Sequence, residues 1–169
     1  MDNKEFNILL RRRARDLGLC DQWYDEWDIE TPQEVLIEKY IKGIDFCIKN
    51  DYPKLDFIKA YVSSKMLAKH GVFVDGNIVE SNAHIAVLLG KSNGIIRYNG
   101  LSTGNVYIRH ESELTIEATD MAKVFVETYE GCKLKAVATG NSKIFVYWHG
   151  GDVNVSGNVT VRDKRKAEK

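Results

Sequence analysis

The side chains best suited to acid–base or metal chemistry in this sequence are its four histidines, His70, His84, His110 and His149. His110 and His149 lie in corresponding gaps of a repeated strand pattern, each after the first strand of its repeat. These repeats are two apart, so strands stacked at ~4.8 Å would separate the histidines by roughly 10 Å, too far to share one metal ion directly. Tyr129 and Trp148 lie nearby in the pattern. The four side chains could form a groove at a corner of the repeats, or they could be ordinary surface residues of turns.

Carboxylates lie in the same stretch, at Glu111, Glu113, Glu117, Glu127 and Glu130. Paired carboxylates could cleave glycosides, and some parallel β-helices do act on polysaccharides. The sequence has no Gly-rich phosphate loop, no G-x-S-x-G, no H-E-x-x-H and no hexapeptide repeat of the kind found in acyltransferases. We therefore expect a protein that is not an enzyme and needs no cofactor.

Charge and cysteine content restrict the partners, metal sites and disulfides that this protein is expected to have. The formal net charge is zero, which argues against a nucleic-acid partner, because phosphate neutralisation normally requires a basic excess. Cys20, Cys47 and Cys132 are odd in number and widely spaced, so they predict neither a zinc site nor a disulfide framework. The N-terminus is too polar for a signal peptide, and no apolar run approaches the ~20 residues that span a bilayer. We expect no membrane contact and a location in the cytoplasm or in a particle assembled there.

The N-terminal region, residues 1–71, predicts helices over residues 4–17, 31–50 and 54–69. The second begins with Thr31-Pro32-Gln33-Glu34, in which Thr31 and Glu34 match a capping box. Trp23 and Trp27 are four apart and would share a helix face, where they either pack on a core or stack on a ligand. Such helices would cover the open end of a following sheet.

Residues 83–162 repeat short apolar-x-apolar triplets separated by Gly, Asn and Ser. Segments beginning at Asn105, Lys123 and Lys143 resemble one another at spacings of 18 and 20 residues, and a second triplet follows each. Strands this short bury enough surface only when coils stack. An antiparallel sandwich is the competing prediction, but the two-level repeat favours a β-solenoid (β-helix) of about four coils with two main strands each.

Two flanking segments complete the predicted organisation. Asp75-Gly76 between apolar runs predicts a hairpin or linker over residues 72–82, and residues 163–169 form a charged tail. The predicted fold class is therefore α+β, with N-terminal helices followed by a short solenoid.

The triplets also predict two different outer faces, because neighbouring side chains of a strand point to opposite sides. Tyr107, Phe125 and Phe145 would occupy equivalent outward positions and stack as an aromatic ladder. Arg109, Glu127 and Tyr147 would flank this ladder, whereas the second strands would present Thr115, Lys135 and Asn154. An exposed aromatic ladder normally marks a contact, so the N-terminal helices, a second copy of the chain or a foreign ligand would cover it. The candidate binding residues are Tyr107, Phe125, Phe145, Tyr147, Trp148, His110 and His149.

Three segments carry a resemblance to a known group: Leu19-Cys-Asp-Gln-Trp-Tyr-Asp-Glu-Trp27, Lys42-Gly-Ile-Asp-Phe-Cys-Ile-Lys49 and the repeating Val-x-Val tail. They resemble a group of small uncharacterised proteins from phages and integrated elements of gut bacteria related to Bacteroides. The resemblance covers most of the chain and implies a mobile-element context, but no site residue.

The leading hypothesis is therefore a phage-type structural or protein-interaction module, such as a virion component or assembly factor, that binds itself as a homo-oligomer or binds a partner protein. One alternative is an intracellular effector that inhibits a host defence protein. The other is a carbohydrate-binding or carbohydrate-degrading module.

Overall fold

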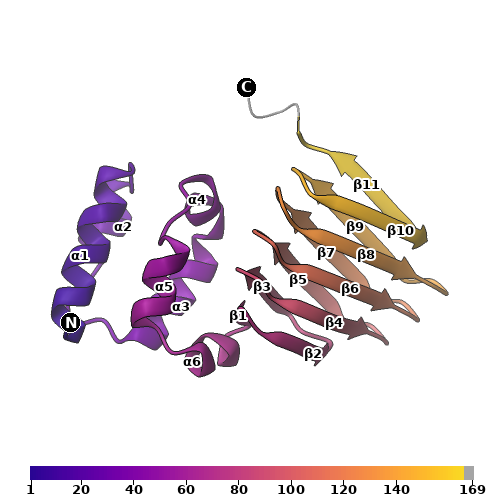
Figure 1. The fold of residues 1–169 in the computed structure, drawn as a ribbon, viewed down its shortest axis with the longest axis horizontal. Helices are drawn as coiled ribbons and strands as arrows, with labels where there is room; N and C mark the ends of the chain where they lie inside the picture. The colour runs from indigo at the N-terminus through magenta and orange to yellow at the C-terminus, as the bar shows by residue number, and fades with distance from the viewer. Residues whose placement is uncertain (166–169) are drawn as a thin grey trace. The chain divides into compact units, whose positions relative to one another are not determined.

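The computed structural model describes residues 1–165, and the chain divides between His70 and Gly71 into two compact units (Figure 1). The first unit is helical, as predicted. Its elements are α1 (Asn3–Asp16), α2 (Asp21–Asp25), α3 (Gln33–Lys42), α4 (Ile44–Lys49), α5 (Leu55–Tyr61) and α6 (Ser64–Lys69). No helix within residues 1–165 has the length and apolar content needed to cross a bilayer.

Two helices predicted as continuous are interrupted in the structure. The helix predicted over 31–50 breaks at Gly43, where an added Cβ would lie 3.3 Å from the Trp23 indole. The helix predicted over 54–69 breaks at Val62, whose extended backbone ends α5. Ser63 then caps α6 by accepting a hydrogen bond from the Met66 N–H. Contacts with other helices and a local cap thus override the continuous apolar stripe.

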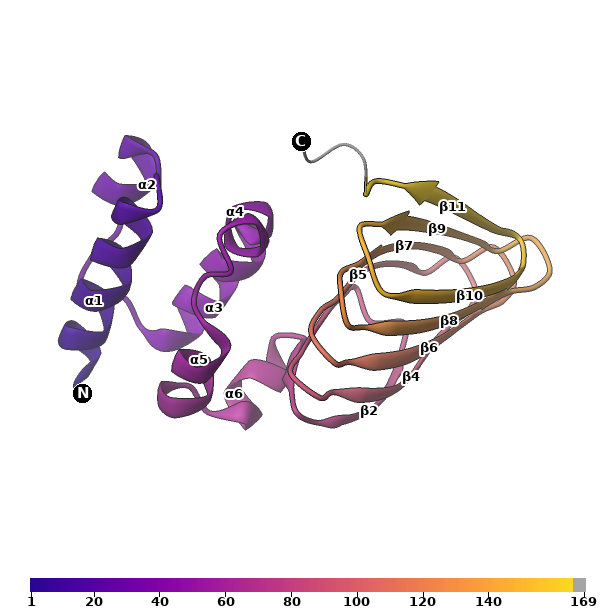
Figure 2. The ribbon, with the colours of Figure 1, turned by 45° about the horizontal axis from the view of Figure 1, so that its top comes forward.

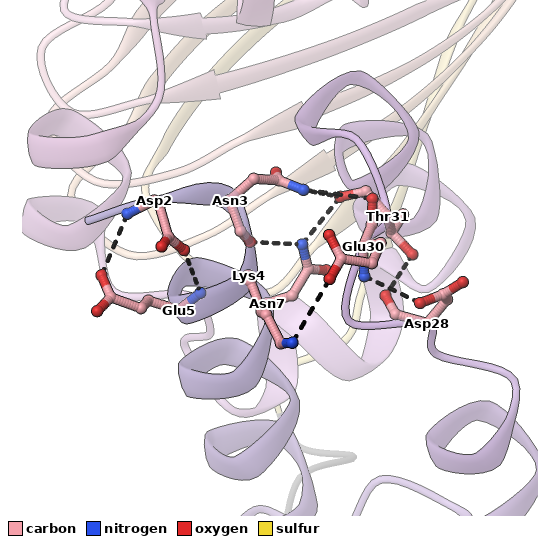
Figure 3. Close-up of polar contacts among 8 residues, drawn as sticks. All are labelled: Asp2, Asn3, Lys4, Glu5, Asn7, Asp28, Glu30 and Thr31. Atoms are coloured by element: carbon pink, nitrogen blue, oxygen red, sulfur yellow. Dashed lines mark hydrogen bonds and ion pairs between the residues drawn. The ribbon is translucent and has the colours of Figure 1, made fainter.

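The capping box predicted at Thr31 is wrong. The residue that caps α3 is Pro32, with no side-chain bond, and the Thr31 hydroxyl donates instead to the Asp28 carbonyl at 2.6 Å (Figure 3). The Thr31 carbonyl accepts from the Asn7 side-chain amide at 2.8 Å. A capping box does occur at the start of α1, between Asp2 and Glu5 (Figure 3).

The second unit is the predicted solenoid, formed by two parallel sheets (Figure 2). The six-stranded sheet has the order β1 (Val72–Val74), β3 (Ile85–Leu89), β5 (Thr103–Ile108), β7 (Lys123–Thr128), β9 (Lys143–Trp148) and β11 (Val159–Asp163). The five-stranded sheet has the order β10 (Asp152–Gly157), β8 (Lys133–Ala138), β6 (Glu113–Ala118), β4 (Asn93–Tyr98) and β2 (Asn77–Ser81). Consecutive strands alternate between the sheets, so each coil contributes one strand to each.

Four two-strand coils, β3 to β10, lie within the predicted range of residues 83–162. The hairpin predicted over 72–82 is wrong, because β1 and β2 pair in parallel with β3 and β4 and form a coil of their own. Asp75, with φ 53°, turns the chain from one sheet to the other, not back along the same sheet. In the predicted charged tail, β11 continues to Asp163, while residues 166–169 lie outside the described part of the chain.

Each coil from β4 to β9 contains 20 residues, as the pairings of Glu113 with Lys133 and of Lys123 with Lys143 show. Six-residue strands alternate with four-residue turns. Residues with positive φ recur in these turns, ten residues apart at Gly90, Gly100, His110 and Asp120, and then at Gly131 and Gly140. This conformation favours Gly, Asn, Asp and His, which explains the turn composition.

The solenoid core is a stack of inward-facing aliphatic side chains. Val106, Val126 and Val146 occupy one column of it and are at most 1% exposed. Tyr98 is a large exception, because its ring fills the space beside Gly104 and its hydroxyl donates to the Ala83 carbonyl at 2.9 Å. A Cβ on Gly104 would overlap this ring, so the glycine makes room for the tyrosine.

Candidate functional site

The outer face of the six-stranded sheet carries most of the predicted binding residues, but in a different register. Phe125 pairs with Phe145 on one side and with Asn105 on the other. Tyr107 pairs with Glu127, which pairs with Tyr147. The predicted three-residue ladder is therefore wrong: Phe125 and Phe145 form one column, and Tyr107 belongs to the next.

The register error has a physical origin in the core. Each six-residue strand has three inward positions, which in β5 are Gly104, Val106 and Ile108. The apolar triplet of β5 uses the last two, whereas that of β7 uses the first two, Val124 and Val126. Because Gly104 and the buried Thr128 occupy inward positions without being part of an apolar triplet, the triplets of β5 and β7 are offset by two residues relative to the strand register.

Phe125 and Phe145 stack with ring centroids 5.3 Å apart and an interplanar angle of 14°. Both rings are partly buried. Together with Tyr107 and Tyr147, which are also partly buried, they form what we call the aromatic face. Four rings on adjacent columns offer flat apolar surface at little cost in conformational entropy.

A hydrogen-bonded trio lies along one side of this face. The Tyr129 hydroxyl donates to the Glu127 carboxylate at 2.6 Å, and Nε2 of His149 lies 3.4 Å from the same oxygen. The Tyr129 and His149 rings stack with centroids 4.8 Å apart. Burial, followed by the bond to Glu127, raises the pKa of the Tyr129 phenol well above its usual range. At neutral pH the phenol is therefore protonated, with its proton directed to Glu127.

The predicted corner groove does not come together. His110 and His149 do not occupy equivalent positions of their coils. The backbone N–H of His149 donates to the Thr128 carbonyl, and the backbone N–H of Arg109 donates in the same way to the Leu88 carbonyl. The counterpart of His149 is therefore Arg109. His110 instead occupies a positive-φ turn, where its Nδ1 accepts from the Gly90 N–H at 3.1 Å.

Trp148 is also directed away from the predicted groove. Its indole N–H donates to the Gly151 carbonyl at 2.9 Å, and the Arg165 guanidinium lies 3.5 Å from its ring centroid. Of the predicted corner residues, Tyr129 and His149 stack on one another.

Cations from the end of the chain border the aromatic face. Arg162 and Lys164 lie 5.7 Å and 5.9 Å from the Tyr147 ring centroid. The register also places Lys123, Lys143 and Arg109 on this outer face, against the carboxylate of Glu127. The prediction of a charged tail over residues 163–169 missed Lys164 as a member of this group. The signal for it was the continuation of the Val-x-Val pattern through Val161.

The five-stranded sheet presents a polar outer face, as predicted. Thr115, Lys135 and Asn154 lie side by side on β6, β8 and β10. An open groove of about 660 Å³ crosses this face and reaches Trp148. Along it, Lys133 and Glu113 of neighbouring coils form an ion pair at 2.6 Å.

A second cavity, of about 300 Å³, lies in the helical unit and was not predicted. Its walls come from several separate segments between Leu10 and Pro53, so no local sequence pattern predicts it. Within residues 1–165, no three His, Cys, Asp or Glu side chains gather in a way that could hold a metal ion.

Comparisons with known proteins return no match: no family model, no curated protein and no solved structure matches this chain.

Proposed function

We propose that this protein is a non-enzymatic, phage-type interaction module that binds an acidic segment of a partner protein through its aromatic face. The observation that carries the proposal is the combination of four partly exposed rings with a bordering group of cations. Aromatic side chains and arginine are enriched at the centres of protein interfaces, where they supply most of the binding energy.

Charge complementarity supports the acidic character of the partner. Within residues 1–165, the strand register and the ring contacts place five cations and one carboxylate on this outer face, whereas the chain as a whole has a net charge of zero. Arg162 and Lys164 lie beside the Tyr147 ring, so a carboxylate of the partner would bind next to apolar surface. A rigid parallel sheet holds these groups in place before binding, which lowers the entropic cost of association.

The resemblance to phage and mobile-element proteins supports the role of virion component or assembly factor. Mass spectrometry of purified particles and of infected-cell lysate separates the alternatives. Detection in particles at stoichiometric amounts favours a virion component, and detection in lysate alone favours an assembly factor or an effector.

The binding proposal is tested with two fluorescent twelve-residue peptides, one alternating glutamate with leucine and the other alternating lysine with leucine. Fluorescence anisotropy should show binding of the acidic peptide that weakens as salt is added. Tyr147→Ala should weaken it by about tenfold, and Arg162→Glu should act in the same direction. The matched control is Lys135→Glu on the five-stranded sheet, which should leave affinity unchanged.

Equal binding of both peptides, or an equal effect of Lys135→Glu and Arg162→Glu, contradicts the proposal. Preference for a single-stranded oligonucleotide over the acidic peptide also contradicts it, because stacked rings and cations are features of such binders as well.

Self-association is a second candidate, favoured by a separate observation. Val155 and Val161 are 37% and 39% exposed, although their partners in the preceding coil, Ala136 and Val146, are fully buried. Within residues 1–165, β10 and β11 each have a strand neighbour on one side only. Apolar interior residues and unpaired strand edges together form a surface that a second copy could cover.

A further inference from the structure

The cavity in the helical unit has apolar walls built mainly from aromatic rings. It encloses about 300 Å³, at the small end of the range typical of ligand sites. The aromatic members of its lining are Trp23, Trp27, Tyr40, Phe46 and Tyr52. Leu10, Ala14, Leu19 and Leu36 add aliphatic surface to the wall.

Hydrogen bonds hold two of these rings in place. The Trp27 indole N–H donates to Asn7 Oδ1 at 2.8 Å, and Asn7 is itself fully buried and bonded to the Thr31 carbonyl. The Tyr52 hydroxyl donates to the Leu10 carbonyl at 2.9 Å. Because their polar atoms are bonded elsewhere, both rings present apolar surface to the cavity.

Within the described part of the chain, Lys39 is the single charged side chain of the lining. It lies on α3 and is partly buried, and no ion pair joins it to another residue of the described chain. A second cation, Lys42, lies 6.0 Å from the Trp23 ring centroid. Among the described residues, no carboxylate belongs to the lining, so an anion bound here would contact a cation and no like charge in the cavity wall.

We propose that the helical unit binds a small apolar carboxylic acid, with its apolar body in this cavity and its carboxylate at Lys39 Nζ. An apolar body gains from leaving water, and the ammonium of Lys39 supplies a charge-assisted hydrogen bond that fixes orientation. This site is separate from the aromatic face and does not depend on the function proposed for it.

Octanoate and 1-octanol are the matched probes, because they share a chain length and differ in charge. Trp148→Phe removes the one tryptophan outside the cavity and leaves Trp23 and Trp27 as reporters. In this background octanoate should change the tryptophan emission at lower concentration than 1-octanol does. Lys39→Met should weaken octanoate binding about tenfold and leave 1-octanol binding unchanged. The control Lys49→Met, an exposed lysine on α4 outside the lining, should leave both unchanged.

A thiol measurement gives an independent readout. Cys20 lines the cavity and is exposed, whereas Cys47 and Cys132 are buried. Octanoate should therefore slow alkylation of Cys20 in the Trp148→Phe protein at the concentrations that change its emission. Ala14→Phe should fill the cavity and abolish both effects while circular dichroism retains the helical signal. If Ala14→Phe does not fold, the comparison of Lys39→Met with Lys49→Met still decides.

The proposal is overturned if octanoate neither changes emission nor protects Cys20. Equal affinity for octanoate and 1-octanol also overturns it, as does octanoate binding that Lys39→Met leaves intact.

Discussion

Phe125 and Phe145 stack across neighbouring coils, with ring centroids 5.3 Å apart and planes inclined by 14°. They occupy paired positions on β7 and β9, so the coil repeat itself brings the rings together. Stacked aromatic pairs contribute energy beyond the area they bury.

A double-mutant cycle should measure this contact. We expect the costs of Phe125→Ala and Phe145→Ala in free energy of unfolding to be non-additive, with a coupling of about 0.5–1.5 kcal/mol. Urea unfolding of the four proteins gives the coupling. The control pair Tyr107 and Phe125, which the register places in different columns, should couple more weakly. Equal coupling in both pairs would support the misaligned ladder that the triplets suggest.

The Tyr98 and Gly104 pair should behave as one unit of the core. Gly104→Ala places a methyl group against the Tyr98 ring, so we expect a loss of about 1–3 kcal/mol in the free energy of unfolding. In a Tyr98→Ala background, the space is vacated and the same substitution should cost much less. Denaturant titration of the four proteins tests this, and additive costs would contradict the packing argument.

Stability should fall in alkaline solution because of Cys132. Burial raises the pKa of this thiol from about 9 to about 11. Below pH 9 both states hold the proton. Between pH 9 and 11 the unfolded chain loses it while the folded protein keeps it, so stability falls as pH rises through this window. The loss is at most about 2.7 kcal/mol.

Cys132→Ser is the matched variant for this measurement. Ser92 and Ser112 stand one residue before β4 and β6, as Cys132 stands before β8, so serine is suited to this corner. Buried tyrosines also titrate in alkaline solution, and the difference between the two proteins removes their contribution. Identical pH profiles would show that Cys132 is not the cause.

Self-association through the terminal coil should be sensitive to Val155 and Val161. If a second copy covers this end, light scattering should detect a dimer, and Val161→Lys should shift it to a monomer by placing a charge in the interface. Tyr147→Ala on the aromatic face is the control and should leave the dimer intact. A monomer at all concentrations, or a dimer that persists in Val161→Lys, would exclude this surface.

Much of the fold follows from the sequence because the solenoid is built from local repeats. Period-two apolar residues and turn residues at ten-residue intervals specify strand, turn and inward face within each coil, so the α+β class and the coils of β3 to β10 were predictable. The polar column of Thr115, Lys135 and Asn154 followed from the same alternation. The helices of the first unit were predictable as a region, although Gly43 and Val62 interrupt them.

Only the tertiary structure decided which residues meet across coils. The Asp75-Gly76 turn has the local sequence of a hairpin, yet β1 and β2 pair in parallel with β3 and β4. The next coil thus supplies a hydrogen-bonding partner for one edge of each strand. Tyr107 does not belong to the column of Phe125 and Phe145, because Gly104 occupies the first inward position of β5. The Tyr98 ring of the preceding strand packs against this glycine. The cavity at Lys39 is likewise lined by segments that are far apart in sequence. Side-chain volume and long-range packing decide these contacts, and neither has a period that a single strand or helix reveals.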